Sequence, residues 1–174
     1  MKKVIVLILL FSTIIFSQNH KYKKFDSLIG KWKGIGTGSE NEKSTIRTEF
    51  NFVMGSKYIE VINDSQFEPT SKNPDGEHHI DKGFISFDAT RNLFVFRQFH
   101  IEGFVIQYIL VDSLSSESKL VFESEKIENF VRGGKARWTI TQITHNAIQT
   151  TFDVSMPNKG YQRFGENKFI RMSK

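Results

Sequence analysis

Hydrophobic and polar residues alternate along most of the chain beyond residue 30, with the period of two that is typical of β-strands. In the segment 44–54, for example, Ile46, Phe50 and Met54 share one face, and polar or charged residues occupy the other. Turn-forming residues separate the alternating segments at intervals of about 8–12 residues, which favours a barrel over a sandwich. The sequence therefore predicts an all-β fold, an antiparallel up-and-down β-barrel of about ten strands. The predicted strands are 30–38, 44–54, 57–63, 79–88, 93–100, 104–112, 119–125, 136–143, 147–156 and 162–172.

The first predicted strand is unusual because glycine or tryptophan stands at every second position. Its repeating face consists of Gly30, Trp32, Gly34, Gly36 and Gly38. Glycine in a strand costs conformational entropy and usually marks a bend or a close approach of another backbone. We therefore expect a sharply bent opening strand in which Trp32 plugs the barrel. A barrel has an interior, and an interior can hold a ligand.

The N-terminal 17 residues have the layout of a secretory signal peptide. Two lysines precede an apolar run over residues 4–16, and the small residue Ser17 marks the expected cleavage point. The run of about 13 residues is shorter than the roughly 20 that a membrane-spanning helix needs, and no later segment is long enough. We expect an exported protein, periplasmic or extracellular, without a membrane span. Residues 18–174 then form one β-barrel domain with a short helix or turn over 18–28. The longest loop is expected at 64–77.

Composition narrows the classes of function. The chain carries 24 lysines and arginines against 19 aspartates and glutamates, but the basic residues are interspersed with acidic ones. This distribution indicates a mixed solvated surface and no nucleic-acid partner. No cysteine is present, which excludes disulfides and a thiol nucleophile. Neither a Gly-x-Ser-x-Gly elbow nor a phosphate-binding glycine loop occurs, so a binding protein is expected more than an enzyme.

A phenylalanine-rich strand carries the main candidates for ligand binding. The chain has 17 phenylalanines, and in the segment 93–100 Phe94, Phe96 and His100 share one face while Arg97 lies on the other. If the first face points inward, an aromatic wall ends in an imidazole near the barrel mouth, where it can hydrogen-bond a ligand or, as a weaker alternative, bind haem iron. If the second face points inward, a buried guanidinium needs a carboxylate partner. Either His100 or Arg97 could also be buried with a protein partner of its own, in which case no ligand is needed to explain its position.

Two later aromatic residues, Tyr108 and Trp138, have polar tips that need a partner when buried, and a ligand can serve as that partner. No catalytic residue is assigned. The predicted ligand-binding residues are Trp32, Phe94, Phe96, Arg97, His100, Tyr108 and Trp138.

Three metal-binding residue types stand close together at His78, His79 and Asp81. Neighbouring residues of a strand point to opposite faces, so only His79 and Asp81 could share an ion, and two ligands fall short of a zinc site. We interpret the three residues as a polar strand entrance and predict no metal site.

The spacing Gly30-x-Trp32-x-Gly34-x-Gly36, at the start of a barrel of about ten strands, resembles the nitrobindin-like haem-binding barrels. These belong to the calycin superfamily, together with lipocalins and fatty-acid-binding proteins. The resemblance implies a barrel that holds haem or another apolar molecule. If the chain is nitrobindin-like, the resemblance further implies a ferric haem that reacts with nitrogen oxides.

The residues that bind ligands in that superfamily are not matched here. The nitrobindin haem ligand is a histidine near the C-terminal end of the barrel, but no histidine follows His145, so no haem ligand is carried over. Tyr161 is a weaker alternative, because tyrosinate can bind ferric haem. Tyr161-x-Arg163 also reverses the Arg-x-Tyr pair of the fatty-acid-binding proteins.

The sequence thus leads to one preferred function and two alternatives. We expect an exported barrel that binds a small apolar or amphipathic molecule in a phenylalanine-rich interior closed by Trp32. The first alternative is a haem-dependent barrel of the nitrobindin kind that acts on nitrogen oxides. The second is a structural or partner-binding barrel without a ligand.

Overall fold

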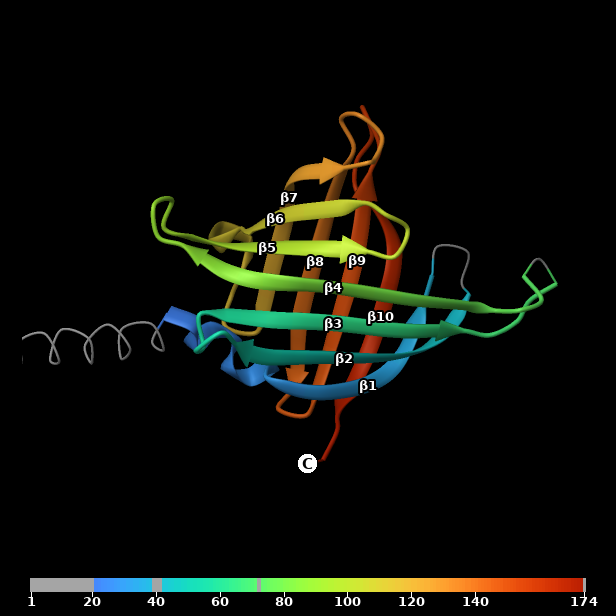
Figure 1. Ribbon diagram of the computed structural model, residues 1–174, viewed down its shortest axis with the longest axis horizontal. Coiled ribbons are helices and arrows are strands. Elements are labelled where there is room, and N and C mark those ends of the chain that lie inside the picture. The colour runs from blue at the N-terminus through green and yellow to red at the C-terminus, as the bar shows by residue number, and fades with distance from the viewer. Residues whose placement is uncertain (1–20, 39–41, 72, 174) are drawn as a thin grey trace, which may run out of the picture.

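The computed structural model describes residues 21–38, 42–71 and 73–173, so the predicted signal peptide lies outside the described residues. Ten antiparallel strands form a closed barrel (Figure 1), in which consecutive strands pair and β1 also pairs with β10. This confirms the predicted up-and-down β-barrel. No helix within these ranges is long and apolar enough to cross a membrane. The elements are η1 (Tyr22–Leu28), β1 (Gly30–Thr37), β2 (Lys43–Val53), β3 (Tyr58–Phe67), β4 (Glu77–Asp88), β5 (Leu93–His100), β6 (Val105–Leu110), η2 (Asp112–Leu114), β7 (Lys119–Glu128), β8 (Lys135–Thr144), β9 (Ala147–Ser155) and β10 (Gln162–Arg171).

The hairpin of β3 and β4 is longer than the sequence indicates. The segment expected as a loop is strand at both ends, since Asp64 pairs with Ile80, β3 ends at Phe67 and β4 begins at Glu77. Alternation fails as a signal here because both faces of these strand ends are polar. The inner side chains, such as Asn63 and Ser65, line a cavity, and the outer ones face solvent.

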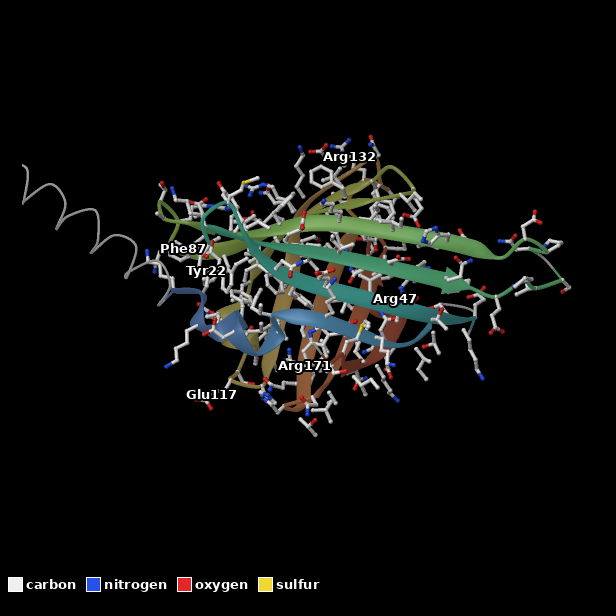
Figure 2. All side chains as sticks on the ribbon, turned by 60° about the horizontal axis from the view of Figure 1, so that its bottom comes forward. Tyr22, Arg47, Phe87, Glu117, Arg132 and Arg171 are labelled. Carbon is white, nitrogen blue, oxygen red and sulfur yellow. The ribbon has the colours of Figure 1, made fainter. Side chains whose placement is uncertain are left out.

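A short 3₁₀-helix, η1, closes one end of the barrel (Figure 1). The Tyr22 hydroxyl donates to the backbone carbonyl of Lys57 at 2.5 Å and accepts from the amide of Phe87 at 3.0 Å, which ties η1 to the β2–β3 turn and to β4 (Figure 2). The expected short helix is therefore present in the described part of residues 18–28. Its buried side chains are Tyr22, Phe25 and Leu28.

Trp32 on β1 lies fully buried beside η1, at the position expected of a plug. Its Nε1 donates to the carbonyl of Leu28 at 2.8 Å, and the Arg171 guanidinium lies 4.0 Å from the centre of the ring. Arg171, labelled in Figure 2, also donates to the backbone carbonyls of Ser27 and Ile29. The first strand, the last strand and η1 therefore meet around one indole.

The glycine face of β1 allows its backbone to approach β10 closely. A Cβ at Gly34 would lie 2.8 Å from the carbonyl carbon of Lys168 and 2.9 Å from the Cα of Phe169. A side chain of any size would therefore push the two strands apart. Closure of the barrel between its first and last strands depends on glycine at this position.

Aromatic rings fill the half of the barrel next to η1. The ring centres of Phe25 and Phe94 lie 4.9 Å apart, and Phe96 lies 5.0 Å from Trp138 and 5.6 Å from Tyr108. Such pairs contribute about 0.5–1.5 kcal/mol each beyond the area they bury. The phenylalanine-rich interior is present, but in this half the rings pack against one another.

Candidate functional site

The other half of the interior contains a cavity of about 190 Å³, at the open end of the barrel. Trp138 lies at its inner side, against the aromatic half, and stacks on Phe50 with 6.5 Å between ring centres. Gln98 is 5% exposed and also lines the cavity. The remaining polar lining comes from the inward positions of neighbouring strands and includes Ser44, Asn63, Ser65, Asp81, His100 and Asn167.

An aspartate and a histidine form a pair in the cavity wall. Asp81 on β4 and His100 on β5 are direct cross-strand partners, and the Asp81 Oδ1 lies 3.0 Å from the His100 Nδ1. The imidazole also stacks on Phe104, with 4.1 Å between ring centres. In the neutral imidazole, the carboxylate next to Nδ1 selects the tautomer with its proton on Nδ1, because Nδ1–H donates to Asp81. The lone pair of the second nitrogen, Nε2, is then left as an acceptor.

The His100 Nε2 has no hydrogen-bond partner among the described residues, although the side chain is only 8% exposed. A buried polar atom without a partner costs about 1–3 kcal/mol. Because the His100 side chain lines the cavity, a molecule bound there with a hydrogen-bond donor is a natural partner for this nitrogen.

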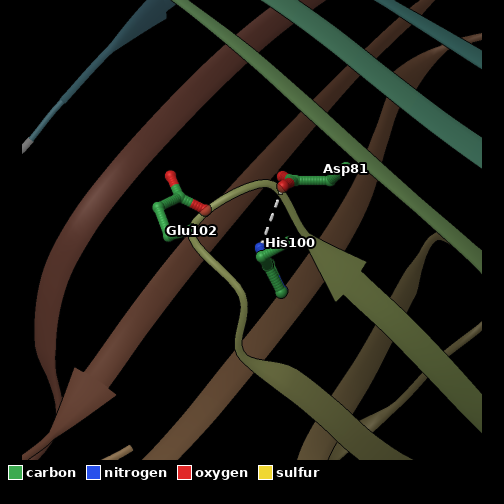
Figure 3. Close-up of side chains that lie close together, drawn as sticks. All are labelled: Asp81, His100 and Glu102. Carbon is green, nitrogen blue, oxygen red and sulfur yellow. Dashed lines mark ion pairs between the residues drawn. The ribbon is translucent and has the colours of Figure 1, made fainter. Parts of the chain in front are cut away.

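Glu102, His79 and Glu77 form a chain of ion pairs beside Asp81 and His100. Glu102, in the β5–β6 turn, has an oxygen 2.5 Å from Nδ1 of His79, and Nε2 of His79 lies 2.8 Å from a Glu77 oxygen. One ligand atom from each of Asp81, His100 and Glu102 lies within 4.8 Å of the others (Figure 3).

The metal-type residues are therefore grouped differently from what the local sequence indicates. His78 points outward and lies 2.8 Å from Asp64, whereas Asp81 gains His100 and Glu102 from the following hairpin. His79 and Asp81 do face the same side, as expected, but the expectation considered one strand alone and left out His100 and Glu102. Pairing between strands brings the additional residues together.

Tyr108 on β6 carries a second unpartnered group. Its side chain is fully buried, and its hydroxyl has no hydrogen-bond partner within the part of the chain that the structure describes. Burial raises the pKa of Tyr108 well above its usual value, and the charge of Asp81 adds to this effect. The phenol therefore stays protonated and can donate a hydrogen bond.

The structure separates the predicted ligand-binding residues into three groups. His100 and Trp138 line the cavity. Arg97 lies on the outer face, where it donates to Gln107 at 3.1 Å and to Ser86 at 3.3 Å, so the alternative that turned it into the interior is wrong. The remaining predicted residues pack in the interior outside the cavity lining: Trp32, Phe94, Phe96 and Tyr108.

The residues in the barrel do not fit a haem. The cavity of about 190 Å³ is too small to enclose a porphyrin while the aromatic half stays packed. Tyr161 lies against the guanidinium of Arg137, at 4.1 Å, and does not line the cavity. Burial, followed by the charge of Glu123, raises the pKa of Tyr161, which disfavours the tyrosinate that iron would need. Arg163 pairs with Asp153 on the outside of the barrel.

A larger hollow of about 950 Å³ lies on the outer face of the barrel, over β1, β2, β9 and β10. Arg47 (Figure 2) and Lys33 lie opposite each other there, beside Ile35 and Ile170, which are 67% and 56% exposed. This hollow is wide and open to solvent. The buried groups without partners lie in the interior, so the smaller cavity is the better candidate site.

Comparison with known proteins supports the fold and nothing finer. No protein-family model and no curated protein matches the sequence. The solved structure of Rv2717c from M. tuberculosis aligns with a TM-score of 0.58 at 12% identity, over 87% of this chain and 97% of that one. A structure described as EF1p2_mFAP2b bound to DFHBI aligns at 0.46 and 9% identity, over 86% of this chain and 98% of that one. A de novo designed fluorescence-activating β-barrel aligns with a TM-score of 0.41 at 13% sequence identity, over 83% of this chain and 93% of that one.

Proposed function

We propose that this protein binds a small molecule in the cavity at the open end of the barrel, with the His100 imidazole as its polar anchor. The observation that carries the proposal is the His100 imidazole, which lines the cavity and whose buried Nε2 has no hydrogen-bond partner among the described residues. Ligand pockets are usually apolar with a few placed polar groups, and this cavity follows that design.

The cavity also limits the ligand. A volume of about 190 Å³ equals roughly six water molecules at about 30 Å³ each, and it lies below the roughly 300–1,000 Å³ of sites for drug-sized molecules. Phe104, Trp138 and Phe152 offer aromatic contact beside the imidazole. A compact aromatic or amphipathic molecule with one hydrogen-bond donor matches both features. Export through the N-terminal signal, to the periplasm or beyond, is part of the same proposal.

Phenol and benzene test this proposal, because they share a ring and differ in the hydroxyl donor. We expect phenol to bind up to about tenfold more tightly than benzene, the effect of one hydrogen bond in a buried site, and to shift the ¹⁵N resonance of the His100 Nε2. His100→Phe keeps a ring in the wall and removes the acceptor, so the preference for phenol should disappear. Arg97→Gln, on the outer face, is the matched control and should leave both affinities unchanged.

Three outcomes would overturn the proposal. The first is equal affinity of the unmodified protein for both probes. The second is a preference for phenol that survives His100→Phe. The third is binding of neither probe, which would favour a structural barrel with a filled core.

A further inference from the structure

We infer that the open end of the barrel contains a binding site for a divalent transition-metal ion, formed by Asp81, His100 and Glu102. One donor atom from each residue lies within 4.8 Å of the other two (Figure 3). Donors that share one ion at roughly 2.0–2.2 Å lie at most about 4.4 Å apart. Shifts of a few tenths of an ångström would therefore bring these three into one coordination sphere.

The fold fixes the backbone under each of the three ligands. Asp81 and His100 are cross-strand partners on β4 and β5. Glu102 lies in the turn that follows β5, and this turn is closed by hydrogen bonds from the Gly103 amide to the His100 carbonyl at 2.9 Å and from the His100 amide to the Phe104 carbonyl at 3.1 Å. The three ligands thus come from one hairpin edge and an adjoining tight turn.

The local charges independently indicate a missing cation. Asp81, Glu102 and Glu77 have only histidines as ion-pair partners among the described residues, and no described lysine or arginine pairs with any of them. Elsewhere in the barrel, half-buried carboxylates do have such partners, as Glu60 has Lys82 and Asp153 has Arg163. A divalent ion held by Asp81, His100 and Glu102 would add positive charge next to these carboxylates.

The buried imidazole supplies the nitrogen donor of the site. The His100 side chain is more than nine-tenths buried, and its Nδ1 lies 3.0 Å from Asp81, so Nδ1 is the nitrogen that would bind the ion. One imidazole and two carboxylates form a mixed nitrogen and oxygen donor set, which suits zinc and other first-row divalent metals better than calcium or magnesium. Three protein ligands also leave a coordination position open.

His79 is a positioning residue in this proposal. Its Nδ1 contacts Glu102 at 2.5 Å and its Nε2 contacts Glu77 at 2.8 Å, so the ring holds the Glu102 carboxylate from behind. Such outer contacts orient the ligands of a metal and typically change its affinity about 10–100-fold.

A titration of the chelator-treated full chain with zinc chloride tests the site. We expect one zinc ion per chain by calorimetry, a higher Tm with zinc, and no comparable effect of magnesium or calcium. Asp81→Asn and Glu102→Gln should each weaken zinc binding by about tenfold or more. His78→Gln is the matched control, because His78 lies near Asp81 on β4 but forms an exposed pair with Asp64 on the outer face.

Cobalt replaces zinc in a second measurement, in which its visible absorption reports coordination by the protein. A folded protein, judged by far-ultraviolet circular dichroism, that takes up neither metal overturns the inference. Zinc binding that His78→Gln weakens as much as Asp81→Asn also overturns it. Phenol binding is measured in the metal-free protein, so it tests the proposed ligand site and not the metal site. Loss of metal binding therefore leaves the phenol preference intact if the ligand site is correct, and each proposal can be rejected without the other.

Discussion

The two ends of the barrel use the same strands for different purposes. At the closed end, Tyr22 and Trp32 direct their polar tips to backbone groups, and aromatic rings fill the space. At the open end, His100 lies in the wall of a cavity with one nitrogen unpartnered among the described residues. Aromatic filling and satisfied hydrogen bonds stabilise a fold, whereas an unsatisfied buried group lowers stability and creates a place for a ligand. Under the proposed function, stability therefore depends mainly on the closed end of the barrel and binding on the open end.

The largest expected effect is at the closed end. Trp32→Ala removes a fully buried indole and its contacts with Arg171 and Leu28. We expect a loss of about 3–5 kcal/mol in the free energy of unfolding, measured by urea denaturation. Ile35→Ala on the outer face of the same strand should change it by less than about 0.5 kcal/mol. A small loss for Trp32→Ala would mean that the plug does not hold this end closed.

A smaller effect is expected from Tyr22→Phe, which removes only a hydroxyl. That hydroxyl bridges the carbonyl of Lys57 and the amide of Phe87, so both backbone groups lose their side-chain partner. The expected loss is about 1–2 kcal/mol in the free energy of unfolding, without any change in phenol binding. An altered affinity for phenol would contradict the division between the two ends.

The sequence alone predicts most of this fold, because the alternation of apolar and polar residues follows the inner and outer faces of the strands. The prediction is wrong where that contrast is missing. Asp64 belongs to β3 and not to a loop, and the pattern does not reveal this because its inward neighbours Asn63 and Ser65 are polar as well. The glycine pattern of β1 correctly indicated a close approach of another strand. The backbone of β1 packs against β10 at Gly34, where any side chain would collide with the backbone of β10.

The candidate site was only partly predictable. His100 appeared in one of two alternatives, and choosing between His100 and Arg97 required knowing which face of β5 points inward. Its partners Asp81 and Glu102 were missed, because neighbours across a sheet are not neighbours in sequence. A signal did exist: counting outward from the turn at residues 89–92 pairs Asp81 with His100.

The smallest effect, with the opposite sign, is expected from Tyr108→Phe. This substitution is the counterpart of Tyr22→Phe in the same barrel, but the Tyr108 hydroxyl is buried without a partner among the described residues. Its removal should leave the free energy of unfolding unchanged or raise it by up to about 1 kcal/mol, because an unsatisfied polar group is replaced by an apolar one. The two variants are measured in the same urea series. Equal losses in the free energy of unfolding would show that the Tyr108 hydroxyl has a hydrogen-bond partner, such as a buried water molecule. The two ends of the barrel would then differ less in their hydrogen bonding than the proposed contrast requires.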